Sequence, residues 1–86
     1  MKELRKTTEN MQWMGQEQMI CYRLFEQPGE GRSCYGVSVE NPNTGEYAVV
    51  EDVTLERDRA EQLMDLLTVG QVTPVSLREI VEDFIA

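Results

Sequence analysis

The fold is decided by residues 19–50, which read MICYRLFEQPGEGRSCYGVSVENPNTGEYAVV. This stretch contains three runs rich in β-forming residues, at 19–25, 34–40 and 47–50, and Pro-Gly and Asn-Pro-Asn turn sequences separate them. In the second run, apolar residues alternate with small or polar ones, which is typical of a strand with one buried face. Three consecutive strands joined by short turns predict an antiparallel meander with one face covered and the other face in contact with water.

The segment before these strands is less regular. Residues 1–10 are almost entirely polar, and this predicts a frayed terminus. We expect residues 1–15 to form either a flexible tail or a short edge strand at 10–14 that ends in a tight turn at Gly15-Gln16. Residues 16–86 are expected to form a single α+β domain, because a chain of this length buries only one core.

Beyond the third strand, the spacing of the apolar residues becomes helical. The first helix is marked by four apolar residues: Ala60, Leu63, Met64 and Leu67. The second is marked by a stripe that runs to the end of the chain: Leu77, Ile80, Val81, Phe84 and Ile85. We expect Thr54 or Asp52 to provide the N-cap of the first helix, and Gly70 to end it in a left-handed conformation. Thr73 as N-cap and Pro74 as the first helical residue mark the start of the second helix.

Both helices need an apolar surface to cover, and the inner face of the sheet is the only one available. The sequence therefore predicts an α+β fold, in which two C-terminal α-helices pack on one face of a three-stranded antiparallel β-meander. The meander becomes four-stranded if residues 10–14 join it. The expected core consists of Ile20, Tyr22, Leu24, Tyr35, Val37, Val39, Leu63, Leu67, Leu77, Val81 and Phe84.

Five short motifs mark the part of the chain after residues 1–15, which we call the leader. They are Tyr22-Arg23-Leu24, Tyr35-Gly36-Val37, Val50-Glu51-Asp52-Val53, Val72-Thr73-Pro74-Val75 and Leu77-Arg78-Glu79-Ile80-Val81-Glu82-Asp83-Phe84. Together they resemble a family of short uncharacterised proteins from anaerobic Gram-positive bacteria, which is catalogued as a domain of unknown function. The resemblance covers residues 19–86, and the segment from Thr73 to Phe84 is its most specific part. It implies one compact bacterial cytosolic domain, and it carries over no activity, cofactor or catalytic residue.

The charge of the chain argues against several classes of function. Sixteen acids and eight bases give a net charge of −8, and all of it lies in residues 40–86, because acids and bases balance in residues 1–39. A polyanionic surface repels phosphate backbones and anionic lipid head groups, so we expect binding to neither nucleic acid nor membrane. No apolar run approaches the length of a membrane span, and no signal-peptide core follows the first residues. We therefore expect a cytoplasmic location.

The residues that carry chemistry are few. The chain has no histidine, which removes the commonest general base and metal ligand. Cys21 and Cys34 are too few for a zinc site; on the outer face of the sheet they are either small hydrophobic residues or, beside a cation, a reactive pair. The adjacent acids Glu51-Asp52 and Glu82-Asp83 are typical of a solvated surface rather than of a catalytic carboxylate pair. The sequence predicts a non-enzymatic protein with no catalytic residue, no metal ligand and no cofactor.

Two groups of side chains are candidates for an interaction surface. They are Met11, Trp13 and Met14 in the leader, and Glu79, Glu82 and Asp83 in the last helix. Large apolar side chains in a polar leader must pack either on the domain or on a partner. Acids near the C-terminus of a helix oppose its dipole. Either an internal arginine (Arg23, Arg32 or Arg78) offsets them, they are tolerated at a cost, or a basic partner binds there.

Two functions from different classes follow. The first is a small non-enzymatic cytosolic module that binds another protein, with a homodimer formed through an outer strand edge or the Trp13 segment as one version. The second is a regulatory protein that binds a small ligand or a divalent metal in an acidic pocket between the sheet and the helices. Calcium or magnesium that raises the melting temperature would favour the second.

Overall fold

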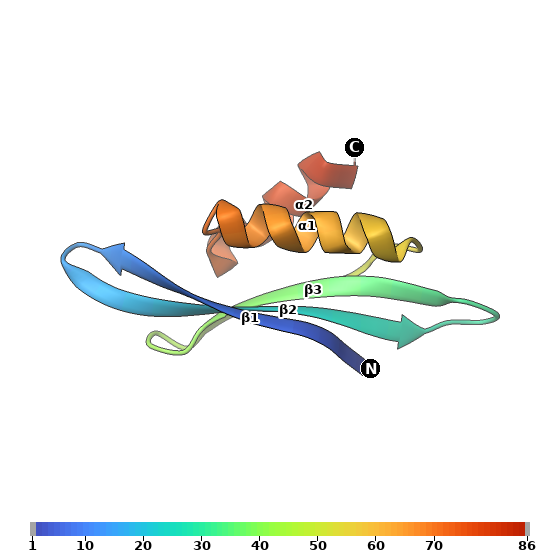
Figure 1. Ribbon diagram of the computed structural model, residues 1–86, viewed down its shortest axis with the longest axis horizontal. Helices are drawn as coiled ribbons and strands as arrows, with labels where there is room; N and C mark the ends of the chain where they lie inside the picture. The colour runs from blue at the N-terminus through green and yellow to red at the C-terminus, as the bar shows by residue number, and fades with distance from the viewer. Residues whose placement is uncertain (1, 86) are drawn as a thin grey trace.

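A computed structural model describes residues 2–85, except for the side chain of Trp13. The elements in chain order are β1 (Lys2–Trp13), β2 (Gln16–Pro28), β3 (Ser33–Asn41), β4 (Glu46–Thr54), α1 (Arg57–Val69), the 3-10 helix η1 (Pro74–Ser76) and α2 (Leu77–Ile85). The strands form one antiparallel sheet in the order β1-β2-β3-β4, and the helices lie on one side of it (Figure 1). The predicted α+β fold is confirmed, in its four-stranded version.

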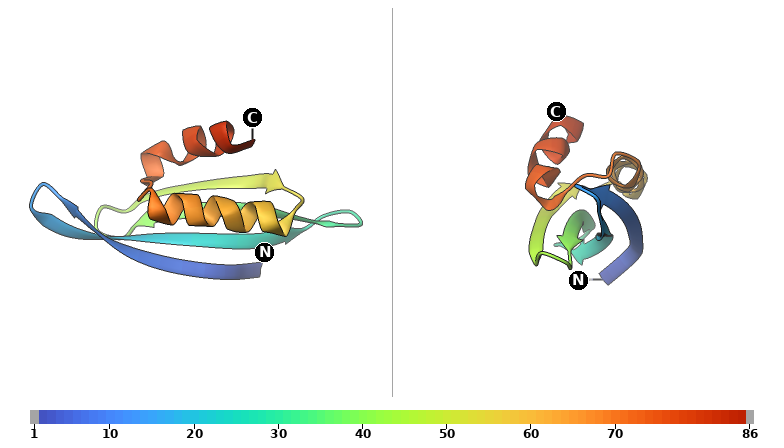
Figure 2. Two further views of the ribbon diagram at one scale, coloured as in Figure 1. Left: turned by 45° about the horizontal axis from the view of Figure 1, so that its top comes forward. Right: turned by 90° about the vertical axis from the view of Figure 1, so that its left-hand side faces the viewer.

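The sheet is twisted and curved, and both helices lie on its concave side (Figure 2). The molecule measures 48 × 25 × 17 Å along its principal axes. It is elongated because the β1–β2 hairpin and the β2–β3 hairpin extend past the helices at opposite ends (Figure 1). The β3–β4 turn lies at the same end as the β1–β2 hairpin, so two turns and the start of η1 meet there (Figures 1 and 2).

Strand β1 is the main departure from the expected fold. It is twelve residues long and pairs with β2 along its length, so the prediction of a frayed terminus is wrong for residues 2–10, and the edge strand is much longer than 10–14. Met1 lies outside the described residues. The physical reason is the turn, in which Met14 and Gly15 both have positive φ, at 52° and 77°. This is the pattern of a two-residue type I′ hairpin, which carries the leader back along β2. The turn predicted at Gly15-Gln16 was one residue too late.

Apolar side chains from the inner face of the sheet and from the helices form one core. Its largest fully buried members are Tyr22, Ile20, Leu24, Leu63, Met64, Leu67, Leu77, Val37, Val39 and Val81. Of the expected core residues, Tyr35 and Phe84 are only half-buried at its margin, whereas Met11 joins it. The hydroxyl of Tyr22 donates a hydrogen bond to the carbonyl of Val72 at 2.8 Å, so the one polar atom of this side chain is satisfied inside the core.

The two helical segments begin differently. Glu56 holds the N-cap position of α1 without a side-chain hydrogen bond, so the prediction that Thr54 or Asp52 provides the cap is wrong. Asp52 lies earlier, in an irregular part of β4 where its φ is 54°. The start of the second segment is confirmed, with Thr73 as N-cap and Pro74 as the first residue, although the first turn is the 3-10 helix η1.

The end of α1 is a Schellman motif shifted by one residue from the prediction. Gly70 keeps a right-handed conformation, and Gln71 takes the left-handed one with φ 49°. The N–H of Gln71 donates to the carbonyl of Thr68, and the N–H of Val72 donates to the carbonyl of Leu67, which is the bond pattern of this motif. The motif turns the chain toward η1 and places that segment against the sheet.

Candidate functional site

The tip of the β1–β2 hairpin projects beyond the helices (Figures 1 and 2). Met14 lies at this tip with 90% of its surface exposed. Its φ of 52° is in the left-handed region, which costs most L-residues about 1–2 kcal/mol. Trp13 is the last residue of β1, and its side chain lies outside the described part of the structure. Met11 points into the core and is only 8% exposed, so it does not share the exposed tip.

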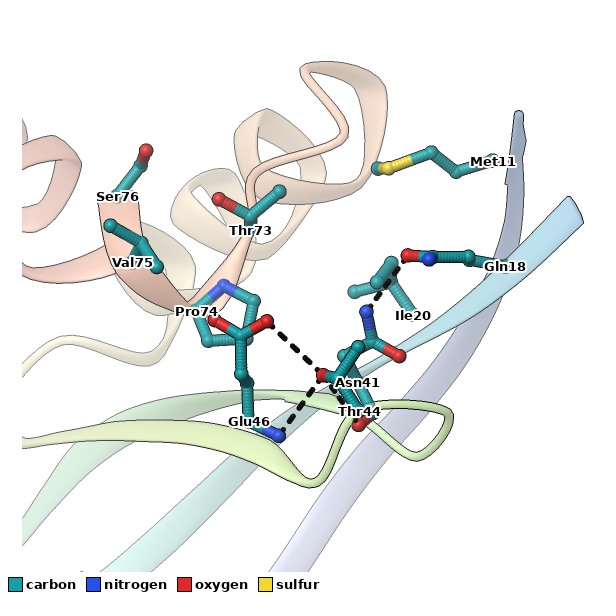
Figure 3. A pocket seen from close by; sticks show the side chains of 10 residues that line it. All are labelled: Met11, Gln18, Ile20, Asn41, Thr44, Glu46, Thr73, Pro74, Val75 and Ser76. Carbon is teal, nitrogen blue, oxygen red and sulfur yellow. Dashed lines mark hydrogen bonds between the residues drawn. The ribbon is translucent and has the colours of Figure 1, made fainter. Parts of the chain in front are cut away.

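A groove of about 360 Å³ lies at the base of this hairpin (Figure 3). Residues from β1, β2, β3, the β3–β4 turn, the start of β4 and the segment around η1 line it: Met11, Gln18, Ile20, Asn41, Thr44, Glu46, Thr73, Pro74, Val75 and Ser76. Met11, Ile20 and Pro74 give it buried apolar surface, whereas Val75 is 81% exposed. The groove is therefore apolar where the hairpin meets η1.

The polar side of the groove is held by a short network of hydrogen bonds (Figure 3). The Asn41 amide nitrogen donates to Gln18 Oε1 at 2.9 Å, and Asn41 Oδ1 accepts from the N–H of Asn43 at 3.0 Å. The Thr44 hydroxyl donates to Glu46 Oε1 at 3.1 Å. Glu46 is the only carboxylate among the residues that line the groove, which is a much less acidic lining than the ligand hypothesis expected.

Two exposed valines at the same end of the molecule were not singled out from the sequence. Val69, the last residue of α1, is 85% exposed, and Val75 in η1 is 81% exposed. Neither valine belongs to the apolar stripe of its helical segment, and this spacing in the sequence indicated that both face away from the core. The C-terminal end of α1, which carries Val69, and η1, which carries Val75, lie toward the end of the molecule from which the β1–β2 hairpin projects (Figure 1).

The predicted acidic patch consists of Glu79, Glu82 and Asp83, all exposed on α2. It lies far from the hairpin tip, so the structure does not bring the two halves of the predicted surface together (Figure 1). None of these carboxylates forms an ion pair within residues 2–85. The end of α2 is instead met by Arg59, whose Nη2 donates to the carbonyl of Phe84 at 3.1 Å and whose guanidinium lies 4.4 Å from the centre of the Phe84 ring.

The arginine that contacts the C-terminal end of α2 is therefore Arg59, and it is not one of the three arginines that the sequence suggested. Arg23 lies on the outer face of the sheet, where its Nε is 3.2 Å from Glu3 Oε1 and its Nη1 is 3.2 Å from Glu40 Oε1. Arg32 and Arg78 are exposed and form no ion pair in the described range. The Arg23 pairs link β1, β2 and β3 across the outer face, and such exposed pairs each contribute less than about 1 kcal/mol.

The two cysteines are free and are not neighbours. Cys34 pairs with Gln27 on β2, which places it about 20 Å along the sheet from Cys21 at ~3.3 Å per residue. The Cys34 thiol donates a hydrogen bond to Asp52 Oδ1 at 2.8 Å. This bond, with a smaller contribution from desolvation, raises the pKa of Cys34 above its ordinary value. A raised pKa lowers the thiolate fraction at neutral pH, which disfavours the reactive interpretation.

The described residues contain no group of three or more His, Cys, Asp or Glu side chains arranged to hold a metal ion. None of the helices within residues 2–85 has the length and apolar character needed to cross a membrane. Fold and surface define a small α+β protein, with a four-stranded antiparallel meander, two helices on one face and a projecting hairpin beside a shallow groove.

The chain belongs to a family of unknown function (DUF6514), which matches residues 1–86. The match includes the leader, which the sequence resemblance over residues 19–86 had left out. No curated protein matches the chain. No solved structure matches it either.

Proposed function

We propose that this protein is a small non-catalytic module of the cytoplasm that binds another protein through the end carrying the β1–β2 hairpin. The observation that carries the proposal is Met14, which is 90% exposed and has φ 52° at the tip of the hairpin. Asparagine or glycine would relieve the backbone strain at this position, so methionine does not increase the stability of the folded chain there. Methionine does suit contact with an irregular apolar surface.

The surroundings of Met14 support a protein partner with an apolar contact surface. Val69 at the end of α1 and Val75 in η1 are more than 80% exposed, and Val75 also lines the groove. Exposed apolar surface with a polar rim is typical of interaction sites. The acidic end of α2 is too far away to share this contact, and it suits a separate partner with a basic surface (Figure 1).

Affinity capture from the native host tests the proposal, with Met14→Asn as the decisive variant. We expect a partner that the unaltered chain and Met19→Asn both retain, and that Met14→Asn loses. Met19 is a half-exposed methionine on β2 of the same hairpin, so its variant controls for the chemical change. Because Met14→Asn should stabilise the turn, loss of the partner cannot come from unfolding. A partner that stays bound to Met14→Asn but is lost on reversing Glu82 and Asp83 would move the contact to α2.

Binding of a small ligand is a second candidate, and the groove of about 360 Å³ favours it because sites for small molecules have volumes of this order. The test is thermal melting of the protein with a panel of small polar metabolites, and with calcium and magnesium. A rise of several degrees that Glu46→Gln abolishes would support the candidate. A flat response across the panel counts against it.

A further inference from the structure

Strand β1 presents an open backbone edge along one margin of the sheet (Figure 2). Its extensive contacts are with β2 alone, and α1 lies over β2 and β3. The two-residue turn determines which backbone groups of β1 face outward. Trp13 and Gln16, the residues on either side of the turn, form a pair that exchanges backbone hydrogen bonds. Along the antiparallel ladder, every second pair from there on also exchanges hydrogen bonds, and the pairs between do not. The residues whose N–H and C=O groups point away from β2 are therefore Lys6, Thr8, Asn10 and Gln12.

The opposite edge of the sheet is protected against pairing. Strand β4 has an irregular register against β3, with Asp52 at φ 54°, and it carries the acids Glu46, Glu51 and Asp52. Bulges and charges are the usual means by which proteins keep an edge strand from pairing. Strand β1 contains no proline, and its register against β2 is regular from Arg5 to Trp13.

Charge also favours β1 as a contact between two chains. The strand carries the bases Lys2, Arg5 and Lys6 against the acids Glu3 and Glu9, a net charge of +1 (3 − 2) in a chain of −8. The acids of β4 lie at the other edge of the sheet, and α2 packs against β4. Two chains joined at β1 would therefore keep the acids of β4 and α2 apart, which lowers the repulsion between them.

We propose that two copies of this chain pair antiparallel through their β1 edges, around a two-fold axis at Thr7. Facing residues must share a face of the sheet, so the axis falls on a residue. Centring on Lys6 or Glu9 sets like charges opposite each other, and centring on Thr8 leaves Arg5 without an opposite charge. Centring on Thr7 sets Arg5 of each copy opposite Glu9 of the other, on both sides of the axis.

Arg5 can form this pair and keep its own contacts. Its Nη1 is 3.2 Å from Glu61 Oε1 and 3.0 Å from Asp65 Oδ1 on α1. The guanidinium has further N–H groups on Nη2 and Nε. Glu9 is half-buried and forms no ion pair within residues 2–85. The inference goes beyond the proposed function, because it uses the edge of the strand and leaves the hairpin tip free.

Sedimentation equilibrium of the full chain over a range of concentrations tests the pairing. The mass of the unaltered chain should rise toward that of a dimer. Glu9→Lys should weaken the dimer roughly tenfold or more, because like charges then face each other on both sides of the axis. Glu17→Lys makes the same charge change on β2, away from the open edge, and should keep the dimer. Thr8→Pro removes an outward N–H without touching the ladder to β2, and should abolish the dimer.

Cysteine cross-linking tests the register in a Cys21→Ala, Cys34→Ser background, because a cysteine at position 8 would otherwise face Cys21 of its own chain across the β1–β2 ladder. Thr7→Cys should form an intermolecular disulfide at the axis, because Cα atoms at a facing position without hydrogen bonds are about 4.5 Å apart. Thr8→Cys should not, and the opposite result overturns the register. A strict monomer at every concentration overturns the pairing itself. So does a dimer that survives Glu9→Lys and Thr8→Pro but is lost in Met14→Asn, since the contact would then be the hairpin tip.

Discussion

Replacing Met14 by asparagine should stabilise the fold. Met14 has φ 52° and precedes Gly15 at φ 77°, a type I′ turn for which Asn-Gly is the preferred sequence. An L-residue in the left-handed region costs about 1–2 kcal/mol, and asparagine relieves much of that cost. The Met14 side chain is 90% exposed, so its removal loses little packing. We expect the free energy of unfolding to rise by about 1 kcal/mol, equivalent to about 4–8 °C in melting temperature for a domain of this size.

Urea denaturation followed by circular dichroism measures the free energy, and a thermal scan at one fixed protein concentration measures the melting temperature. Met19→Asn is the matched control, because it makes the same change on β2 of the same hairpin. It should leave the stability unchanged or lower it, since asparagine is a poor strand residue. A Met14→Asn protein that melts at or below the temperature of the unaltered chain would refute the strain argument, and with it the main support for a partner at the tip.

Three further predictions concern the core and its margins. Burial, with a smaller contribution from Glu9, raises the pKa of Tyr22 from 10.0 to about 12. The folded state therefore holds this proton more tightly, so stability should be full below pH 10 and fall as pH rises toward 12, and Tyr22→Phe should remove that part of an alkaline unfolding curve. Gln71→Gly should add about 1 kcal/mol to the free energy of unfolding in urea, because glycine accepts the left-handed position that ends α1 without strain. Leu67→Ala should cost about 2–5 kcal/mol in the same assay, and Phe84→Ala clearly less, because Phe84 is only half-buried; equal losses would place Phe84 inside the core.

The strands and helices after the leader could be predicted because their apolar side chains repeat with the period of the element. Ile20, Tyr22 and Leu24 alternate along β2, and the stripe of α2 follows helical spacing. Strand β1 has no such repeat, since its inward positions include Arg5 and Glu9. Arg5 is held by carboxylates on α1, and the hydrogen bond to Glu61 spans 56 residues of chain. A contact at that separation leaves no local pattern in the sequence.

The candidate site could be predicted only in part. Large apolar residues in a polar leader drew attention to Met14, which is exposed, and to Met11, which packs on the domain because the register of β1 points it into the core. The groove forms where η1 docks beside the hairpin, and no local pattern predicts how a 3-10 helix sits on a sheet. The contact of Arg59 with the end of α2 likewise depends on how the two helices lie together.

The backbone N–H groups of β1 point alternately toward β2 and away from it, and this alternation also sets the rate at which they exchange their protons with solvent. The N–H groups of Thr7 and Glu9 donate into the ladder with β2, so deuterium should replace them slowly. Those of Lys6 and Thr8 face outward, and a lone chain in heavy water should lose their signals early, which gives a spectrum with every second β1 amide missing. Docking of a second chain would protect those outward amides as well, so the pattern of surviving signals reports the pairing state residue by residue.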